Sequence, residues 1–141
     1  GRRRDVEESL LRKLEQLELD SRCTLNIGYL PADSMECWFA ASDVVVIPYR
    51  KIYQSGVAIQ AISRNKPVLL SDIRPHQDWV SEGLPALLFK DGKPDDLRNV
   101  LLEMAATPEK NRERADRAVS YLRTHHDWNR VAEKIKSLIT S

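Results

Sequence analysis

The sequence is short of net charge and of long apolar runs, and each shortage excludes a class of protein. Its 22 Lys and Arg residues nearly balance 21 Asp and Glu residues, so no overall field attracts nucleic acid or a membrane surface. No apolar run is long enough to span a bilayer, and we expect no secretory signal peptide, because no apolar centre is followed by a small-residue cleavage site. We therefore expect a soluble, cytoplasmic protein with no nucleic-acid partner.

Cysteine is also scarce. Cys23 and Cys37 follow no CxxC or Cys/His spacing, so they indicate no metal site. Both have apolar neighbours, which predicts buried free thiols and fits a reducing compartment. With 42% hydrophobic residues in 141, the chain can form one core, and a single domain over residues 1–141 is expected.

Strand and helix patterns alternate along the chain. The expected strands are Thr24–Tyr29, Val44–Ile47, Pro67–Leu70 and Ala86–Phe89. The expected helices are an amphipathic one carrying Val6, Leu10, Leu14 and Leu17, then Ser34–Ala41, Ser55–Arg64, His76–Ser81, and helices that begin at Pro94, Pro108 and Trp128. This alternation predicts an α/β domain, a doubly wound parallel sheet with helices on both faces.

Two local features qualify this plan. Asp33, with Glu36 three residues later, is expected to cap the helix that begins at Ser34. A doubly wound domain normally opens on a strand, whereas this chain opens on Arg2–Arg4 and a helix, so we expect its first strand to be missing. An apolar edge left bare in this way would allow the fragment to self-associate.

The most informative segment joins the second expected strand to the next helix. Val44–Ile47 is a continuous apolar run, typical of a strand buried on both faces of a parallel sheet, and Pro48 ends it. Ser55 and Gly56 then begin a helix, so the amides of Ser55, Gly56 and Val57 can converge on a phosphate beyond the strand's end. Gly56 lets a ligand approach the backbone, and Ser55 adds a hydroxyl. A plain serine cap on a packed helix is the alternative.

Several segments, taken in order, carry a resemblance to a known family. A helix rich in Leu and Glu is followed by Leu25–Pro31, Ala40–Pro48, Asn65–Asp72 and Asp127–Ala132. In this order they resemble the C-terminal, nucleotide-sugar-binding half of GT-B-fold retaining glycosyltransferases of the group 1 or family 4 type, which include many bacterial enzymes. The resemblance covers the chain from about Glu7 to its end and implies a three-layer, Rossmann-like fold.

The family's functional residues transfer only in part. The family has two glutamates with seven residues between them, the first near the donor sugar and the second on the ribose hydroxyls. The matching positions here hold Ile52 and Gln60. Gln60 can hydrogen-bond a ribose hydroxyl without offering a charge, and Ile52 offers no polar group. Gln54–Val57 resembles a variant of the family's loop in which Ser-Gly-Val replaces Gly-Phe-Gly.

The candidate donor-binding residues surround the end of the Val44–Ile47 strand. They are Tyr49, Arg50, Tyr53, Ser55, Gly56, Val57 and Gln60. Doubly wound sheets bind ligands at this end, where Arg50 or Lys51 could neutralise a phosphate or simply be solvated. Tyr53 can stack on a base or pack. His76 is more typical of a cap or surface residue than of a base.

The resemblance implies a function for a longer protein. That protein would transfer a sugar, as a hexosyltransferase, from a nucleoside diphosphate sugar to a sugar or lipid-linked acceptor in polysaccharide, lipopolysaccharide or glycoconjugate synthesis, with retention. An N-terminal domain outside this chain would bring the acceptor and the family's Arg and Lys, so no catalytic residue is assigned here. The isolated chain is therefore expected to be inactive.

Two further expectations accompany this reading. No metal or other cofactor is implied, and the full-length protein could lie at the inner face of the membrane. The alternative function is a non-catalytic or degenerate glycosyltransferase-like binding module, which the absence of both glutamates favours.

Overall fold

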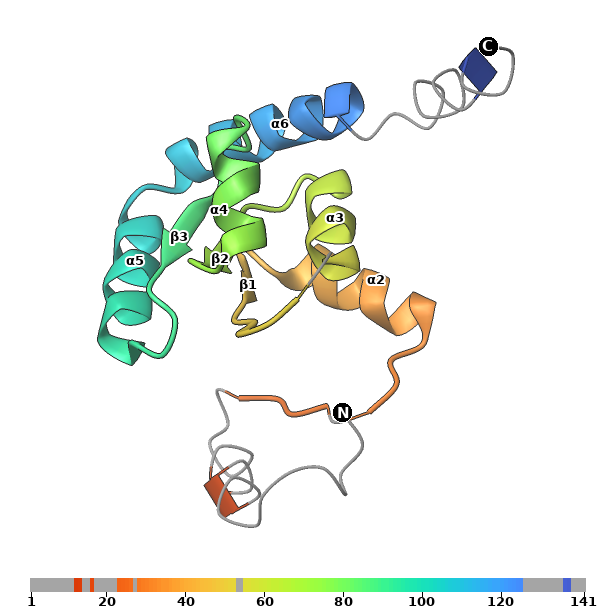
Figure 1. The fold of residues 1–141 in the computed structure, drawn as a ribbon. Coiled ribbons are helices and arrows are strands. Elements are labelled where there is room, and N and C mark those ends of the chain that lie inside the picture. The colour runs from red at the N-terminus through yellow and green to blue at the C-terminus, as the bar shows by residue number, and fades with distance from the viewer. Residues whose placement is uncertain are drawn as a thin grey trace. The chain divides into compact units, whose positions relative to one another are not determined.

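The computed structural model describes residues 12–13, 16, 23–26, 28–52, 55–125 and 136–137 (Figure 1). The chain divides into two compact units, Gly1–Ala40 and Ala41–Ser141. Within the described residues, no helix is long and apolar enough to cross a membrane. The helix expected from Trp128 lies almost wholly outside the described residues, and so does most of the one expected around Leu10, of which Arg12, Lys13 and Gln16 are helical.

The first unit contains most of helix α2, which spans Ala32–Ala41. The helix begins before the position that the sequence suggested, because the Pro31 carbonyl already accepts a hydrogen bond from the Met35 amide at 3.0 Å. Asp33 therefore lies in the first turn and does not cap the helix, so that prediction is wrong. Its carboxylate still lies near the positive end of the helix dipole, where a negative charge is favourable.

Two other predictions for the first unit are also wrong. The described part of Thr24–Tyr29, residues 24–26 and 28–29, contains no strand. An apolar alternating pattern becomes a strand only where a neighbouring strand supplies hydrogen bonds, and the sequence does not name that neighbour. Cys23 and Cys37 are both exposed free thiols, because apolar neighbours along the chain do not ensure burial in space.

The second unit is built on a three-stranded sheet in the order β1-β2-β3. The strands are β1 Val45–Ile47, β2 Val68–Ser71 and β3 Leu87–Phe89. Both pairings are parallel, with Val46 opposite Leu69 and Leu70 opposite Leu88. The parallel α/β prediction is confirmed for this part of the chain, and β2 is the central strand.

Each connection between parallel strands contains a helix. The helices of this unit are α3 Gly56–Ser63, α4 Arg74–Ser81, α5 Pro94–Ala106 and α6 Pro108–His125. Proline occupies the first turn of α4 and α5, where its missing amide costs no helical hydrogen bond. The order of elements therefore agrees with the expected alternation, with boundaries moved by one or two residues.

The core lies on both faces of this sheet. On one face Leu69 and Phe89 pack with Met104 of α5, and Val46 and Leu87 lie against the same cluster. Strand side chains alternate between faces, so the buried Val68 and Leu70 point to the other face. Helix α3 contacts β1 and β2, and its residues Ala58, Ala61 and Ile62 are fully buried. Figure 1 shows α3 and α5 flanking the sheet.

A contact between α6 and the end of α4 closes this unit. The Tyr121 hydroxyl donates a hydrogen bond to the Glu82 carboxylate at 3.2 Å, and the Tyr121 ring stacks on His125 with 4.1 Å between ring centroids. Burial, followed by the hydrogen bond and the negative charge of Glu82, raises the pKa of Tyr121 to about 12.

Met104 offers a direct test of the core. Met104→Ala removes a side chain that is 2% exposed, and we expect the free energy of unfolding to fall by about 2–5 kcal/mol. Leu102→Ala in the same helix is the matched control, because Leu102 is 57% exposed, and its effect should stay below about 0.5 kcal/mol. Urea denaturation measures both, and equal effects would contradict the assignment of α5's buried face.

Tyr121 predicts an alkaline limit to stability. Because its pKa is raised from 10.0 to about 12, the folded chain keeps a proton that the unfolded chain loses. The stabilisation is complete below pH 10 and is lost as the pH rises towards about 12. The free energies of unfolding of the wild type and Tyr121→Phe should therefore differ by a constant amount below pH 10. The difference should shrink as the pH rises from 10 towards about 12. Denaturation curves at a series of pH values measure it. A difference that is independent of pH would contradict this explanation.

Candidate functional site

The carboxyl ends of the three strands meet at one edge of the sheet. Because β1, β2 and β3 are parallel and in register, the segments that leave them at residues 48–52, 72–75 and 90–91 lie at the same edge. We call this the carboxyl edge. Open α/β sheets bind ligands in the crevice outside the carboxyl ends of their strands.

Hydrogen bonds join these segments to one another. The buried Ser71 hydroxyl donates to the Tyr49 carbonyl at 2.5 Å, which ties the segment after β1 to the end of β2. The Asp91 amide donates to the Asp72 carboxylate at 2.7 Å, which ties the segment after β3 to the same place. The carboxyl edge is therefore held together across all three strands.

A cavity of about 400 Å³ lies at this edge. It is lined by Arg50, Lys51, Ile52, Ile73, Arg74 and Pro75. Three of these side chains are cationic, and they come from the segments that follow β1 and β2. Such a cluster around an apolar lining suits an anionic ligand with an apolar or aromatic part.

The two arginines have carboxylate neighbours. Arg50 Nε lies 3.8 Å from Asp91 Oδ1, and Arg74 Nε lies 2.9 Å from Asp78 Oδ1. Both arginine side chains are about four-fifths exposed, so these ion pairs are weak and a ligand anion can compete for the guanidinium groups. No ion pair involves Lys51 among the described residues.

The start of α3 supplies a second set of donors. The exposed residues Gly56 and Val57 open the helix, and no described group accepts a hydrogen bond from either amide. A Cβ built at Gly56 would meet nothing within 4 Å, so the backbone is open to an approaching group. Two amides that have no acceptor among the described residues lie at the positive end of the helix dipole, where an anion is favourable.

Ser55 has a different role from these two residues. Its hydroxyl accepts a hydrogen bond from the Ala58 amide at 3.1 Å, and the residue is 1% exposed. This is the geometry of a helix cap, so Ser55 caps α3, while phosphate binding at this loop stays a prediction. A ligand at the start of α3 would meet Gly56 and Val57 before this buried hydroxyl.

The structure describes three of the other residues predicted for the donor site. Arg50 lines the 400 Å³ cavity, and Tyr49 is half-buried beside it in sequence. Gln60 is exposed in α3. Tyr53 and its neighbour Gln54 lie outside the described residues. The residues of α3 are not among those that line the cavity.

His76 contradicts the prediction of a cap or surface residue. It is 1% exposed and lies in the first turn of α4, with Nδ1 2.8 Å from the Ser71 carbonyl. The prediction rested on the usual place of a lone histidine. It fails because α4 turns this side chain towards the end of β2.

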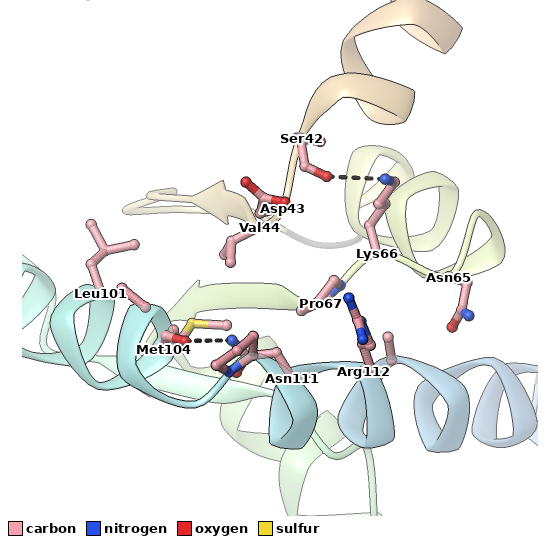
Figure 2. Close-up of a pocket in the computed structure, with 13 residues that line it drawn as sticks. Ser42, Asp43, Val44, Asn65, Lys66, Pro67, Leu101, Met104, Asn111 and Arg112 are labelled. Carbon is pink, nitrogen blue, oxygen red and sulfur yellow. Dashed lines mark hydrogen bonds between the residues drawn. The ribbon is translucent and has the colours of Figure 1, made fainter.

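A separate cavity of about 630 Å³ lies at the opposite end of the strands (Figure 2). Its wall includes Asp43 and Pro67, which precede β1 and β2, and Arg112 from α6. The Lys66 ammonium there donates to the Ser42 carbonyl at 3.0 Å, and the Asn111 amide donates to the Met104 carbonyl at 2.7 Å. These polar groups join parts of the chain to each other, so this cavity is a weaker candidate than the carboxyl edge.

The chain is similar to a solved structure with the GT-B fold, that of sucrose-phosphate synthase from Thermosynechococcus elongatus, with a TM-score of 0.77 and 19% sequence identity. The similarity covers 99% of this chain and 36% of the synthase chain, so this chain spans about a third of that protein. No curated protein sequence matches.

Residues 1–107 match the family described as Glycosyl transferases group 1. The chain belongs to this family. The family resemblance seen in the sequence is therefore confirmed, and so is the Rossmann-like, C-terminal half of a GT-B fold.

Sequence reasoning missed several residues of the carboxyl edge. They are Ser71 at the end of β2, Arg74 at the start of α4 and Asp91 after β3, all distant in the chain from Arg50. A signal was present, because polar residues directly after each expected strand must share one edge if the strands are parallel. Applying that rule to every strand would have found them.

The capping role of Ser55 predicts a specific loss of stability. Ser55→Ala leaves the Ala58 amide without its partner, and we expect the free energy of unfolding to fall by about 1 kcal/mol. Ser63→Ala in the same helix is the control, because the Ser63 hydroxyl donates to the Gln60 carbonyl at an exposed position. Urea denaturation compares them. A larger effect at Ser63 would contradict the capping role.

Proposed function

We propose that this chain is the donor-binding domain of a glycosyltransferase that takes a sugar from a nucleoside diphosphate sugar. The observation that carries the proposal is the pairing of cations and open amides beyond the carboxyl end of β1. Arg50, Lys51 and Arg74 supply positive charge at the cavity, and Gly56 and Val57 supply amides. Membership of a glycosyltransferase family supports our proposal that these groups share one ligand, a diphosphate.

The chemistry of the leaving group explains why such donors matter. Breaking the bond between the sugar and the diphosphate builds negative charge on the diphosphate oxygens. Cations and helix amides that already point at those oxygens stabilise that charge without reorganising. In our proposal the diphosphate lies over the start of α3, with the cationic cavity beside it, and no residue of this chain is assigned a bond-breaking role.

The rest of the donor meets an altered surface. Ile52 lines the cavity where the family has the glutamate near the donor sugar, so this site offers the sugar an apolar contact there. Gln60 is exposed and offers an amide to the ribose hydroxyls. We propose that the donor sugar takes its hydrogen bonds from elsewhere, including the N-terminal domain of the longer protein.

The longer protein would complete the reaction. In this proposal the whole chain acts as one domain, the acceptor arrives on another domain, and the sugar is transferred with retention during polysaccharide or glycoconjugate synthesis in the cytoplasm. The chain alone would bind donor without transferring its sugar. Strand β1 has one unpaired edge in the described sheet, and we place self-association of the isolated chain at that edge.

A second function is a glycosyltransferase-like module that has lost activity. The specific observation in its favour is the pair Ile52 and Gln60 at the positions of the family's glutamates. Such a module would keep the fold and need no nucleotide. The two functions therefore differ in whether a nucleoside diphosphate binds.

Gly56→Trp tests the donor site. The indole would cover the open amides, and we expect affinity for the best of UDP, GDP and ADP to fall at least about 100-fold, or about 2.8 kcal/mol. Ser120→Ala, at an exposed position of α6 outside the proposed site, is the control and should bind as the wild type does. Isothermal calorimetry measures affinity, and circular dichroism verifies that both variants fold.

Each other outcome of this titration has a clear meaning. Saturable binding that survives Gly56→Trp would move the nucleotide away from α3. Failure of all three nucleotides to bind the wild-type chain would contradict a donor-binding domain and favour the inactive module.

A further inference from the structure

Two buried polar side chains at the carboxyl end of β2 have no role in the site described so far. Ser71 is 0% exposed and His76 is 1% exposed. Neither lines the cationic cavity, but the Ser71 hydroxyl bonds the segment that carries Arg50 and Lys51, and His76 bonds Ser71.

The direction of these hydrogen bonds follows from the chemistry of the groups. A carbonyl oxygen can only accept, so His76 Nδ1 carries the hydrogen that it shares with the Ser71 carbonyl at 2.8 Å. The same nitrogen also lies 3.5 Å from the Ser71 hydroxyl oxygen. Because the hydrogen on Nδ1 is directed at the Ser71 carbonyl, His76 fixes the backbone of Ser71, and the Ser71 hydroxyl donates its single hydrogen to the Tyr49 carbonyl.

Histidine is a costly residue to bury for packing alone. His76 Nε2 is buried and has no hydrogen-bond partner in the described part of the chain. An unsatisfied buried polar atom costs stability, and a leucine of similar size would avoid that cost. The hydrogen bond from His76 Nδ1 to the Ser71 carbonyl offsets the stability lost at the unsatisfied Nε2.

We propose that Ser71 and His76 are positioning residues for the donor site. His76 orients Ser71, and Ser71 fixes the Tyr49 carbonyl, so that Arg50 and Lys51 are presented at the cavity before a nucleotide arrives. This inference rests on the proposed function for its ligand, although the tether itself can be tested without one. Preorganisation of this kind lowers the entropy lost when the ligand orders a loop.

Limited trypsin digestion of the full chain measures the tether directly. Trypsin cleaves after Arg50 and Lys51, and native-state cleavage reports how often this segment opens. Ser71→Ala removes one hydrogen bond and should raise cleavage after these two residues about fivefold. Cleavage after Arg117 in α6 is the internal reference, because a global loss of stability would raise cleavage there as well.

Matched variants separate positioning from packing. Ser120→Ala removes an exposed hydroxyl that donates to the Asp116 carbonyl at 3.1 Å, and it should leave cleavage unchanged. His76→Leu should raise cleavage after Arg50 and Lys51 as Ser71→Ala does. His76→Asn places an amide donor near the position of Nδ1 and should restore most of the protection. Wild-type cleavage in both Ser71→Ala and His76→Leu would overturn the inference.

Nucleotide affinity provides the second measurement. Calorimetry with the best of UDP, GDP and ADP should show affinity about fivefold weaker for Ser71→Ala and unchanged for Ser120→Ala. Increased cleavage with unchanged affinity would overturn the role in donor binding. Absence of nucleotide binding by the wild type would overturn the proposed function and this role with it, while the digestion would still report on the tether.

Discussion

Strand β2 is the constraint on which the second unit depends. All four of its residues are buried, and it pairs in parallel with β1 on one side and β3 on the other. Its side chains serve both faces, with Leu69 towards α5 and Val68 and Leu70 towards the face that α3 contacts. Because the pairing is parallel, it also brings three chain segments to one edge, and that edge holds the candidate site.

The same strand connects stability to the site. Ser71 is the last residue of β2, and its hydroxyl donates a hydrogen bond to the Tyr49 carbonyl and not to solvent. Asp72 follows immediately and accepts the Asp91 amide. Short polar contacts at the end of a well-packed strand fix loops that would otherwise move, which is how a rigid sheet can present exposed cations such as Arg50 and Arg74 in a defined place.

Under the proposed alignment with the family's two glutamates, the candidate site carries less negative charge than the family pattern. Ile52 and Gln60 stand at the positions expected for those carboxylates. Both changes remove negative charge near the place where an anionic diphosphate would bind. The cationic cavity and the open amides of Gly56 and Val57 remain. In the proposed donor site, the two substitutions would therefore affect contacts with the sugar and ribose more than attraction of the phosphates.

Local sequence patterns identified the family and the elements of the second unit from β1 to α6. Apolar runs and helix starts are local properties, so β1, β2, β3 and the helices from α3 to α6 were all expected from the residues that form them. Strand pairing and burial became visible only in the folded chain. Residues 24–26 form no strand, Cys37 is exposed, and His76 is buried beside Ser71. The physical reason is that burial and strand pairing depend on neighbours distant in the chain, and a local pattern does not identify them.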